Sequence, residues 1–150
     1  MLPMKAIRLA LGEALAADDT SLAPATDANK IALIAADFVL DESLVIGDLT
    51  LATFNGSTPL AGATGTQLAG IDPLTGEQII TIKEPAGGYR WECAVAPGAP
   101  ETIYGFALID NAGTGLLAVE LLPEPITIAA VGDQIDIGNA TLRMVLAPLS

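Results

Sequence analysis

The sequence predicts an all-β fold, a β-sandwich or jelly-roll-like barrel of about eight short antiparallel strands. From Lys30 onward, short apolar runs alternate with clusters of glycine, proline, asparagine and aspartate, which is the pattern of short strands joined by turns. Residues 1–30 lack this pattern, and we expect an extended, partly helical arm there. The expected organisation is an N-terminal arm (1–30) followed by one β-domain (31–150).

Each expected strand is an apolar run that ends at a turn signal. Glycine and proline separate the runs because glycine accepts positive φ and proline lacks the N–H that a ladder needs. The expected strands are residues 31–35, 49–54, 78–83, 89–95, 102–110, 115–122, 126–131 and 140–146.

A β-hairpin is the clearest local prediction. Runs 102–109 and 116–122 flank an Asp-Asn-Ala-Gly-Thr-Gly turn at 110–115, and Asp, Asn and Gly supply the chemistry of a tight turn. Both faces of the first run are apolar. Such a strand is either central in a two-layer structure or faces a partner.

Two segments fall outside the strand pattern. Residues 55–76 are rich in Gly, Thr and Ala with little periodicity, and we expect a long surface excursion. Residues 4–17 have the spacing of a modest helix with Ile7, Leu11 and Leu15 on one face. The arm then either docks on a neighbouring molecule or is a disordered leader.

The start of the chain imitates a signal peptide. Lys5 and Arg8 precede a short apolar run, and small residues follow it. Gly12 and Glu13 interrupt the apolar region, and the uninterrupted part is too short for the apolar core of a signal peptide. We therefore expect no secretion. Two Asn-x-Ser/Thr patterns, at Asn55 and Asn139, are therefore expected to be coincidental glycosylation matches.

The composition favours a large subunit interface. The 150 residues are 51% hydrophobic and 16% charged, against a usual charged fraction of about 25%. Monomers rarely expose large apolar patches, and obligate interfaces resemble a domain core cut in half. We therefore expect homo-oligomerisation, a trimer being one candidate; the alternative is an alanine-rich surface of no consequence.

The charge excludes two classes of partner. The net charge is −12, and the six basic residues are scattered along the chain instead of forming a stripe. A phosphate backbone or an anionic membrane surface would require clustered positive charge. No apolar run is long enough to span a membrane. We expect neither nucleic acid nor membrane as a partner.

The sequence lacks the usual residues of catalysis. Histidine is absent, which removes Ser-His-Asp and Cys-His mechanisms, and one cysteine without histidine cannot build a common zinc site. There is no P-loop, and Cys93 is expected to be a buried, inert thiol. We expect no enzyme, no cofactor, no metal and no catalytic residues.

Acidic residues leave two weaker possibilities. With 18 Asp and Glu residues, some pair lies close together by chance, but a glycosidase cleft also needs sugar-stacking aromatics. Residues 132–138 and 41–42 carry oxygen ligands that suit Ca²⁺, without the dense spacing of a calcium loop. We expect solvated turn residues at both places.

Large apolar side chains are the candidate interface residues. Trp91 is expected to anchor either the core or an interface, since it buries much area and needs a partner for its N–H; a ligand platform is the alternative. The candidates are Ile7, Leu11, Leu15, Trp91, Tyr104, Phe106 and Leu117.

Residues 76–146 resemble a known family. The stretches that carry the likeness are 102–108 (Thr-Ile-Tyr-Gly-Phe-Ala-Leu), 110–113 (Asp-Asn-Ala-Gly) and 116–120 (Leu-Leu-Ala-Val-Glu). They resemble small structural proteins of tailed bacteriophages. The resemblance implies a virion protein, either a cement or decoration protein on the capsid exterior or a tail, baseplate or receptor-binding module, with a larger capsid or tail protein as partner. A secreted adhesive or carbohydrate-binding β-module is the remaining alternative.

Overall fold

The computed structural model describes residues 2–3, 30–41, 43–61, 68–71, 78–82, 88–110, 112–137 and 142–146. Within these ranges the protein is all-β, as the sequence predicts, and its named strands pair antiparallel. The elements are β1 (Leu2–Pro3), β2 (Lys30–Ile34), the 3-10 turn η3 (Ile46–Asp48), β3 (Leu60–Ala61), β4 (Leu68–Ile71), β5 (Gln78–Ile82), β6 (Tyr89–Glu92), β7 (Glu101–Ile109), β8 (Leu116–Ile128), β9 (Gln134–Ile137) and β10 (Leu142–Leu146).

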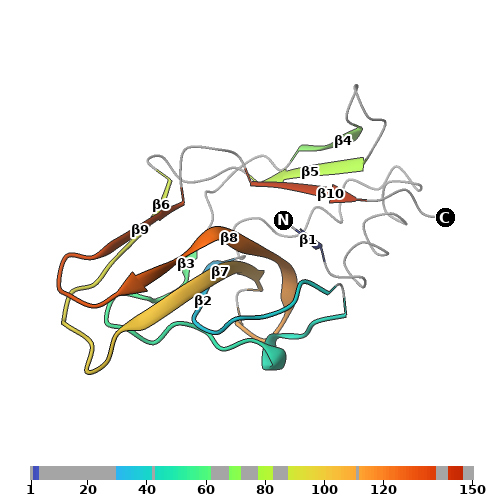
Figure 1. The fold of residues 1–150 in the computed structure, drawn as a ribbon. Coiled ribbons are helices and arrows are strands. Elements are labelled where there is room, and N and C mark those ends of the chain that lie inside the picture. The colour runs from blue at the N-terminus through green and yellow to red at the C-terminus, as the bar shows by residue number, and fades with distance from the viewer. Residues whose placement is uncertain are drawn as a thin grey trace.

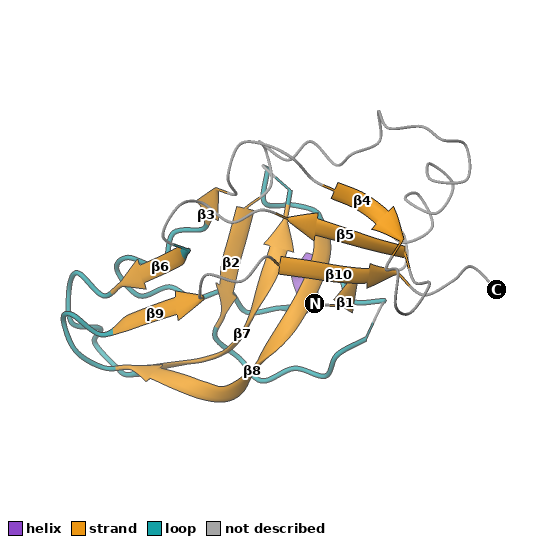
Figure 2. Ribbon diagram, turned by 90° about the horizontal axis from the view of Figure 1, so that it is seen from above, coloured by secondary structure: helices purple, strands orange, loops and turns teal. Residues whose placement is uncertain are grey.

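The described strands form three sheets. The largest has the order β1-β8-β7-β2-β3, a second has the order β10-β5-β4, and β6 and β9 make a two-stranded ribbon. Figures 1 and 2 show β2, β7 and β8 running side by side, with the β6–β9 ribbon and the β4–β5–β10 sheet at opposite ends of the molecule.

The expected hairpin is confirmed as β7 and β8. Leu108 pairs with Ala118 and Phe106 with Glu120. The amide of Asp110 donates to the carbonyl of Gly115 at 3.0 Å and closes the turn. Gly113 adopts φ 74°, a left-handed conformation that glycine accepts without steric cost. Local turn chemistry thus sets the register of the longest strand pair.

Strand β8 merges two strands that the sequence analysis separates. Residues 116–122 and 126–128 of the two expected runs belong to one strand, whereas 129–131 lie beyond its end. The register jumps between the pairs Ile103↔Ile126 and Gly105↔Leu121. The intervening segment contains two prolines, which have no N–H to donate to the ladder. The prolines therefore interrupt the pairing with β7 as an irregularity, whereas we had expected them to end the strand.

Both faces of the β2–β7–β8 sheet are buried. Alternate residues of a strand point to opposite faces, so Ile31 and Leu33 of β2 enter one cluster and Ala32 and Ile34 enter another. The larger cluster lies between the sheet and the β6–β9 ribbon: Ile31, Leu33, Phe54, Tyr89, Trp91, Cys93, Ile103, Phe106, Leu108, Ala118, Ile128 and Ile135. The smaller cluster is Ala32, Ile34, Leu49, Ala107, Ile109, Leu116 and Val119.

One expected strand is wrong. Residues 49–54 form no named strand, although Leu51 makes an isolated bridge with Ile34, and Ala52 donates its amide to the carbonyl of Leu33 at 2.9 Å. The edge of β2 is shared between this segment and β3, which pairs with Lys30 and Ile31. Neither segment therefore pairs with β2 over its full length.

Other expected elements differ in position or extent. The strand at 89–95 ends earlier, at Glu92. Of the expected strand at 140–146, residues 142–146 form β10, and residues 140–141 lie outside the described residues. The expected excursion at 55–76 contains β3 and β4, and the expected arm contains β1. Strand β9 was not predicted. The expected helix at 4–17 lies outside the described residues.

Candidate functional site

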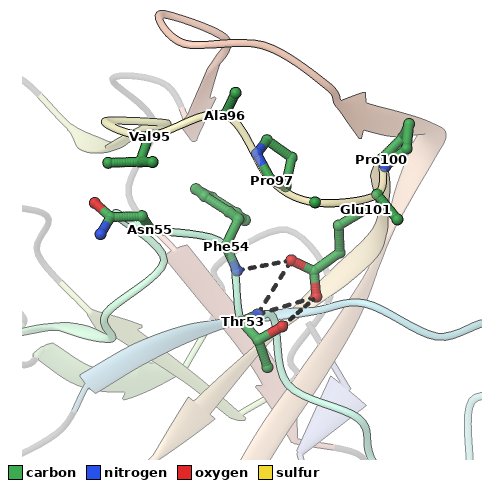
Figure 3. Close-up of a pocket in the computed structure, with 10 residues that line it drawn as sticks. Thr53, Phe54, Asn55, Val95, Ala96, Pro97, Pro100 and Glu101 are labelled. Carbon is green, nitrogen blue, oxygen red and sulfur yellow. Dashed lines mark hydrogen bonds between the residues drawn. The ribbon is translucent and has the colours of Figure 1, made fainter.

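A pocket opens beside the start of β7 (Figure 3). Its volume is about 420 Å³, and small or apolar residues dominate its wall. The wall consists of two stretches of chain, the segment before Gly56 and the loop that joins β6 to β7. The lining residues are Thr53, Phe54, Asn55, Val95, Ala96, Pro97, Gly98, Ala99, Pro100 and Glu101.

Glu101 binds the backbone of two other residues that line this pocket. Its carboxylate accepts hydrogen bonds from the amide of Thr53 at 3.0 and 3.1 Å, from the Thr53 hydroxyl at 3.2 Å, and from the amide of Phe54 at 2.8 Å. These contacts join residues far apart in sequence, and Figure 3 shows them converging on one side chain. Glu101 therefore holds the backbone at 53–54 in place.

The pocket offers little for catalysis. Glu101 is the one carboxylate among its lining residues, so the paired-carboxylate chemistry of a glycosidase has no second group here. Asn55 adds an exposed amide, and the remaining side chains are apolar or small, apart from the Thr53 hydroxyl that Glu101 already binds. The geometry fits a structural hollow between two loops.

Three aspartates have lowered pKa values because they accept hydrogen bonds within their own turns. The pKa of Asp110 falls chiefly through the backbone of Gly115 and then that of Thr114, whose amide lies 2.8 Å from its carboxylate. Backbone amides of Ala129 and then Ala130, at 2.7 and 2.8 Å, lower the pKa of Asp133.

The hydroxyl and amide of Ser43 lower the pKa of Asp41 in the same way. A general acid or base works best with a pKa near the operating pH, and all three of these shifts move the carboxyl group away from neutrality. These aspartates are turn caps.

Two carboxylates of residues 132–138, where Ca²⁺ was the weaker alternative to solvated turn residues, bind other groups. Asp133 binds two amides, and Asp136 binds the Arg90 guanidinium at 2.6 Å across the ribbon. Among the described residues, no group of three or more Cys, Asp or Glu side chains is arranged to hold a metal ion.

The predicted interface residues are divided by the structure. Trp91 is 1% exposed, its indole N–H donates to the Thr58 carbonyl at 3.1 Å, and its ring stacks with Tyr89 at 6.2 Å. Of the two anchoring roles expected for Trp91, in the core or at an interface, the structure shows the core role. Phe106 is buried in the same cluster. Neither side chain is accessible to a partner in this structure.

The remaining candidates are partly exposed or undescribed. Tyr104 and Leu117 are half-buried, and Leu117 packs against the larger cluster. Ile7, Leu11 and Leu15 lie outside the described residues.

Three exposed aliphatic side chains lie instead on the segment between β2 and η3. We call Val39, Leu40 and Val45 the apolar crest; their side chains are 82%, 42% and 58% exposed. The sequence analysis did not single them out. An available signal was the run of three consecutive apolar residues at 38–40, because three neighbours cannot all point into one core.

Hydrogen bonds hold the backbone at one end of the crest, around Val45. The amide of Val45 donates to the Asp48 carboxylate at 2.9 Å, and the amide of Asp48 donates back to the Val45 carbonyl at 3.0 Å. Asp41 caps the turn at Ser43. The backbone that carries the exposed side chain of Val45 is therefore held by hydrogen bonds.

Half-buried neighbours attach the crest to the sheet. Phe38, Leu44 and Ile46 pack against the smaller cluster, so the segment contacts the sheet on both sides of the exposed residues 39–41. Phe38 lies over Gly105 of β7, where an added Cβ would come within 3.0 Å of the Phe38 ring and 2.3 Å of the Glu120 carbonyl oxygen. Glycine at this position lets the aromatic ring reach the sheet.

The comparisons with known proteins found no matching family model, no similar curated protein and no similar solved structure. Within the described ranges, no helix has the length and apolar character that crossing a membrane as a helix requires.

Proposed function

We propose that this chain is a non-enzymatic structural protein that assembles with copies of itself and with a larger protein surface, and that it serves as a cement or decoration protein on the exterior of a phage head. The apolar crest is the observation that carries the assembly part of this proposal. Its three aliphatic side chains are exposed on a segment that half-buried neighbours attach to the sheet and that hydrogen bonds hold at Val45.

Burying the crest supplies a driving force for association. Full burial of one Val or Leu side chain contributes about 1.5–3 kcal/mol. Val39 and Val45 are more than half exposed, so most of this contribution is available to an interface. Contiguous apolar patches on a protein surface commonly mark interaction sites, and the three crest residues lie within seven residues of one another in the chain.

The negative charges near the crest indicate which kind of partner surface would fit it. Asp37, Asp41 and Asp48 are exposed within the same segment. On the larger protein partner, an apolar depression with basic groups at its rim complements this arrangement. The total charge of −12 suits the outside of a shell better than a lumen filled with DNA.

The architecture supports the same proposal. The β2–β7–β8 sheet and the β6–β9 ribbon enclose the larger cluster between them, and we interpret this pair of layers as a β-sandwich with an N-terminal arm. The virion setting comes from the resemblance of residues 76–146 to small structural proteins of tailed bacteriophages. Homo-oligomers and a larger capsid protein are the proposed partners.

Immunoelectron microscopy of particles produced by the source of this sequence tests the virion assignment. Antibodies against the purified chain are expected to label the head surface of intact particles. Label confined to tails would instead support a tail or baseplate module. Absence of label from all particles, with the chain detectable in the same lysate by immunoblot, would contradict a virion role.

A further inference from the structure

The largest sheet ends in a strand of only two residues. In β1, Leu2 pairs with Val119 and Pro3 with Ala118 of β8. Strand β7 covers the other edge of β8, so β1 is the outermost strand of this sheet within the described part of the chain. Figure 2 shows β1 as a short piece at the end of the sheet that β8 and β7 continue.

The edge of β8 accepts a strand only along part of its length. Residues 116–122 contain no proline and can offer backbone N–H and C=O groups to a neighbouring strand. Pro123 and Pro125 lack the N–H and limit further pairing. The accepting stretch is therefore about the length of a short strand, and β1 occupies its residues 118 and 119.

A long connection joins β1 to the rest of the domain. Twenty-six residues (4–29) separate Pro3 from Lys30. Fully extended, they reach up to about 90 Å. A domain of this length has a radius of gyration of about 15 Å. The covalent connection thus permits β1 to pair with β8 of a neighbouring copy as well as with its own.

We propose that, in the assembled protein, β1 of one copy pairs with the β8 edge of its neighbour and links the copies in series. The inference rests on the self-association in the proposed function, because assembly raises the effective concentration of neighbouring β8 edges. The exchanged pairing forms the same backbone hydrogen bonds as the pairing within one chain, as domain swapping does. The partner is a second copy of this chain.

Disulfide trapping between two single-cysteine chains tests this exchange. Both chains carry Cys93→Ser; one also carries Leu2→Cys, and the other carries Val119→Cys with a C-terminal tag that changes its mass. Each chain then has one thiol, so a disulfide within a chain is impossible. Mixing at assembling concentration followed by mild oxidation is expected to give the mixed dimer on a non-reducing denaturing gel.

A matched control uses Thr127→Cys in place of Val119→Cys. Thr127 also lies in β8 but pairs with Thr102 and is distant from β1 in register. The Leu2–Val119 dimer is expected to exceed the control several-fold. The pair Pro3→Cys and Ala118→Cys repeats the test in case Val119→Cys disturbs the core, where Val119 is buried.

The outcomes separate this inference from the proposed function. Mixed dimers at the control level for both register pairs would overturn the exchange. If light scattering of the same samples shows oligomers in that case, self-association stands and only the exchange is wrong. A monomer in light scattering would instead contradict the self-association on which the inference rests.

Discussion

The two faces of the β2–β7–β8 sheet are covered in different ways. On one face, the regular β6–β9 ribbon places Tyr89 and Trp91 over the sheet, and aromatic side chains fill the cluster. On the other face, the irregular segment 35–51 covers a cluster of small and aliphatic residues. The first cover exposes little apolar surface in its strands, whereas the second leaves the apolar crest in solvent.

The difference follows from the local pattern of each cover. Strand alternation in β6 gives buried, exposed, buried, exposed side chains, so its polar residues face water. In the segment around Phe38, apolar and polar residues do not alternate in this way. Some of its apolar side chains pack on the cluster and others face solvent. The strands of the ribbon turn their apolar side chains inward, whereas the second cover leaves three aliphatic side chains in solvent.

The largest loss of stability is expected on the sheet face that the β6–β9 ribbon covers. Trp91→Ala removes a buried indole and its hydrogen bond to Thr58, which should reduce the free energy of unfolding by about 3–5 kcal/mol. Urea denaturation followed by far-ultraviolet circular dichroism measures this loss. A loss below about 1 kcal/mol would show that the ribbon does not depend on its core contacts.

The opposite face is expected to respond to added volume. Gly105→Ala places a Cβ 2.3 Å from the Glu120 carbonyl oxygen and 3.0 Å from the Phe38 ring, so the backbone or the ring must shift. Overpacking of this kind costs about 1–3 kcal/mol. The same urea titration reports the change. A variant as stable as the wild type would mean that Phe38 does not rest on the sheet.

Glu101 joins β7 to the backbone at residues 53–54, and its loss is expected to reduce stability somewhat less. Glu101→Ala leaves the amides of Thr53 and Phe54 without their acceptor, a change of about 1–2 kcal/mol. Glu92→Ala is the matched control, because Glu92 is exposed and accepts one side-chain hydrogen bond at 3.3 Å. Equal losses for the two variants in thermal or urea unfolding would refute the anchoring role of Glu101.

The smallest effect is expected from the turn aspartates and depends on pH. The folded pKa values of Asp41, Asp110 and Asp133 lie below the unfolded value of about 3.9. Their stabilisation is therefore present above that pH and is lost as the pH falls through the lowered folded values. Asn substitution at the three positions should flatten the acid limb of stability against pH. An unchanged limb would contradict the capping assignment.

Local chemistry explains which parts of the fold were predictable. The β7–β8 hairpin follows from the turn at Asp110 and Gly113, whose conformational needs are visible in sequence. Strand β9 was missed although its exposed-buried alternation is present, because four residues that begin just after Gly132 and Asp133 resemble a loop. Its partner β6 lies more than 40 residues away.

The candidate site was less predictable than the fold. Burial of Trp91 and exposure of Val39 both depend on which segment covers which face, and sequence patterns do not give that pairing. The expected strand at 49–54 shows the same limitation. Its residues are apolar enough for a strand, but β3 pairs with part of the β2 edge along which such a strand would lie. Apolar runs thus identify material for a core or an interface without deciding between them.

Sedimentation equilibrium of the wild type and of the Val39→Ser/Leu40→Ser/Val45→Ser variant tests the role of the crest. The wild-type mass is expected to rise above the 15.2 kDa monomer with concentration, and more strongly in high salt, which screens the repulsion between acidic copies. The variant should remain near 15.2 kDa with an unchanged melting curve, while Val131→Ser, an exposed valine outside the crest, should associate like the wild type. A wild type that stays monomeric at all concentrations, or a crest variant that associates as well as the wild type, would contradict assembly through the crest.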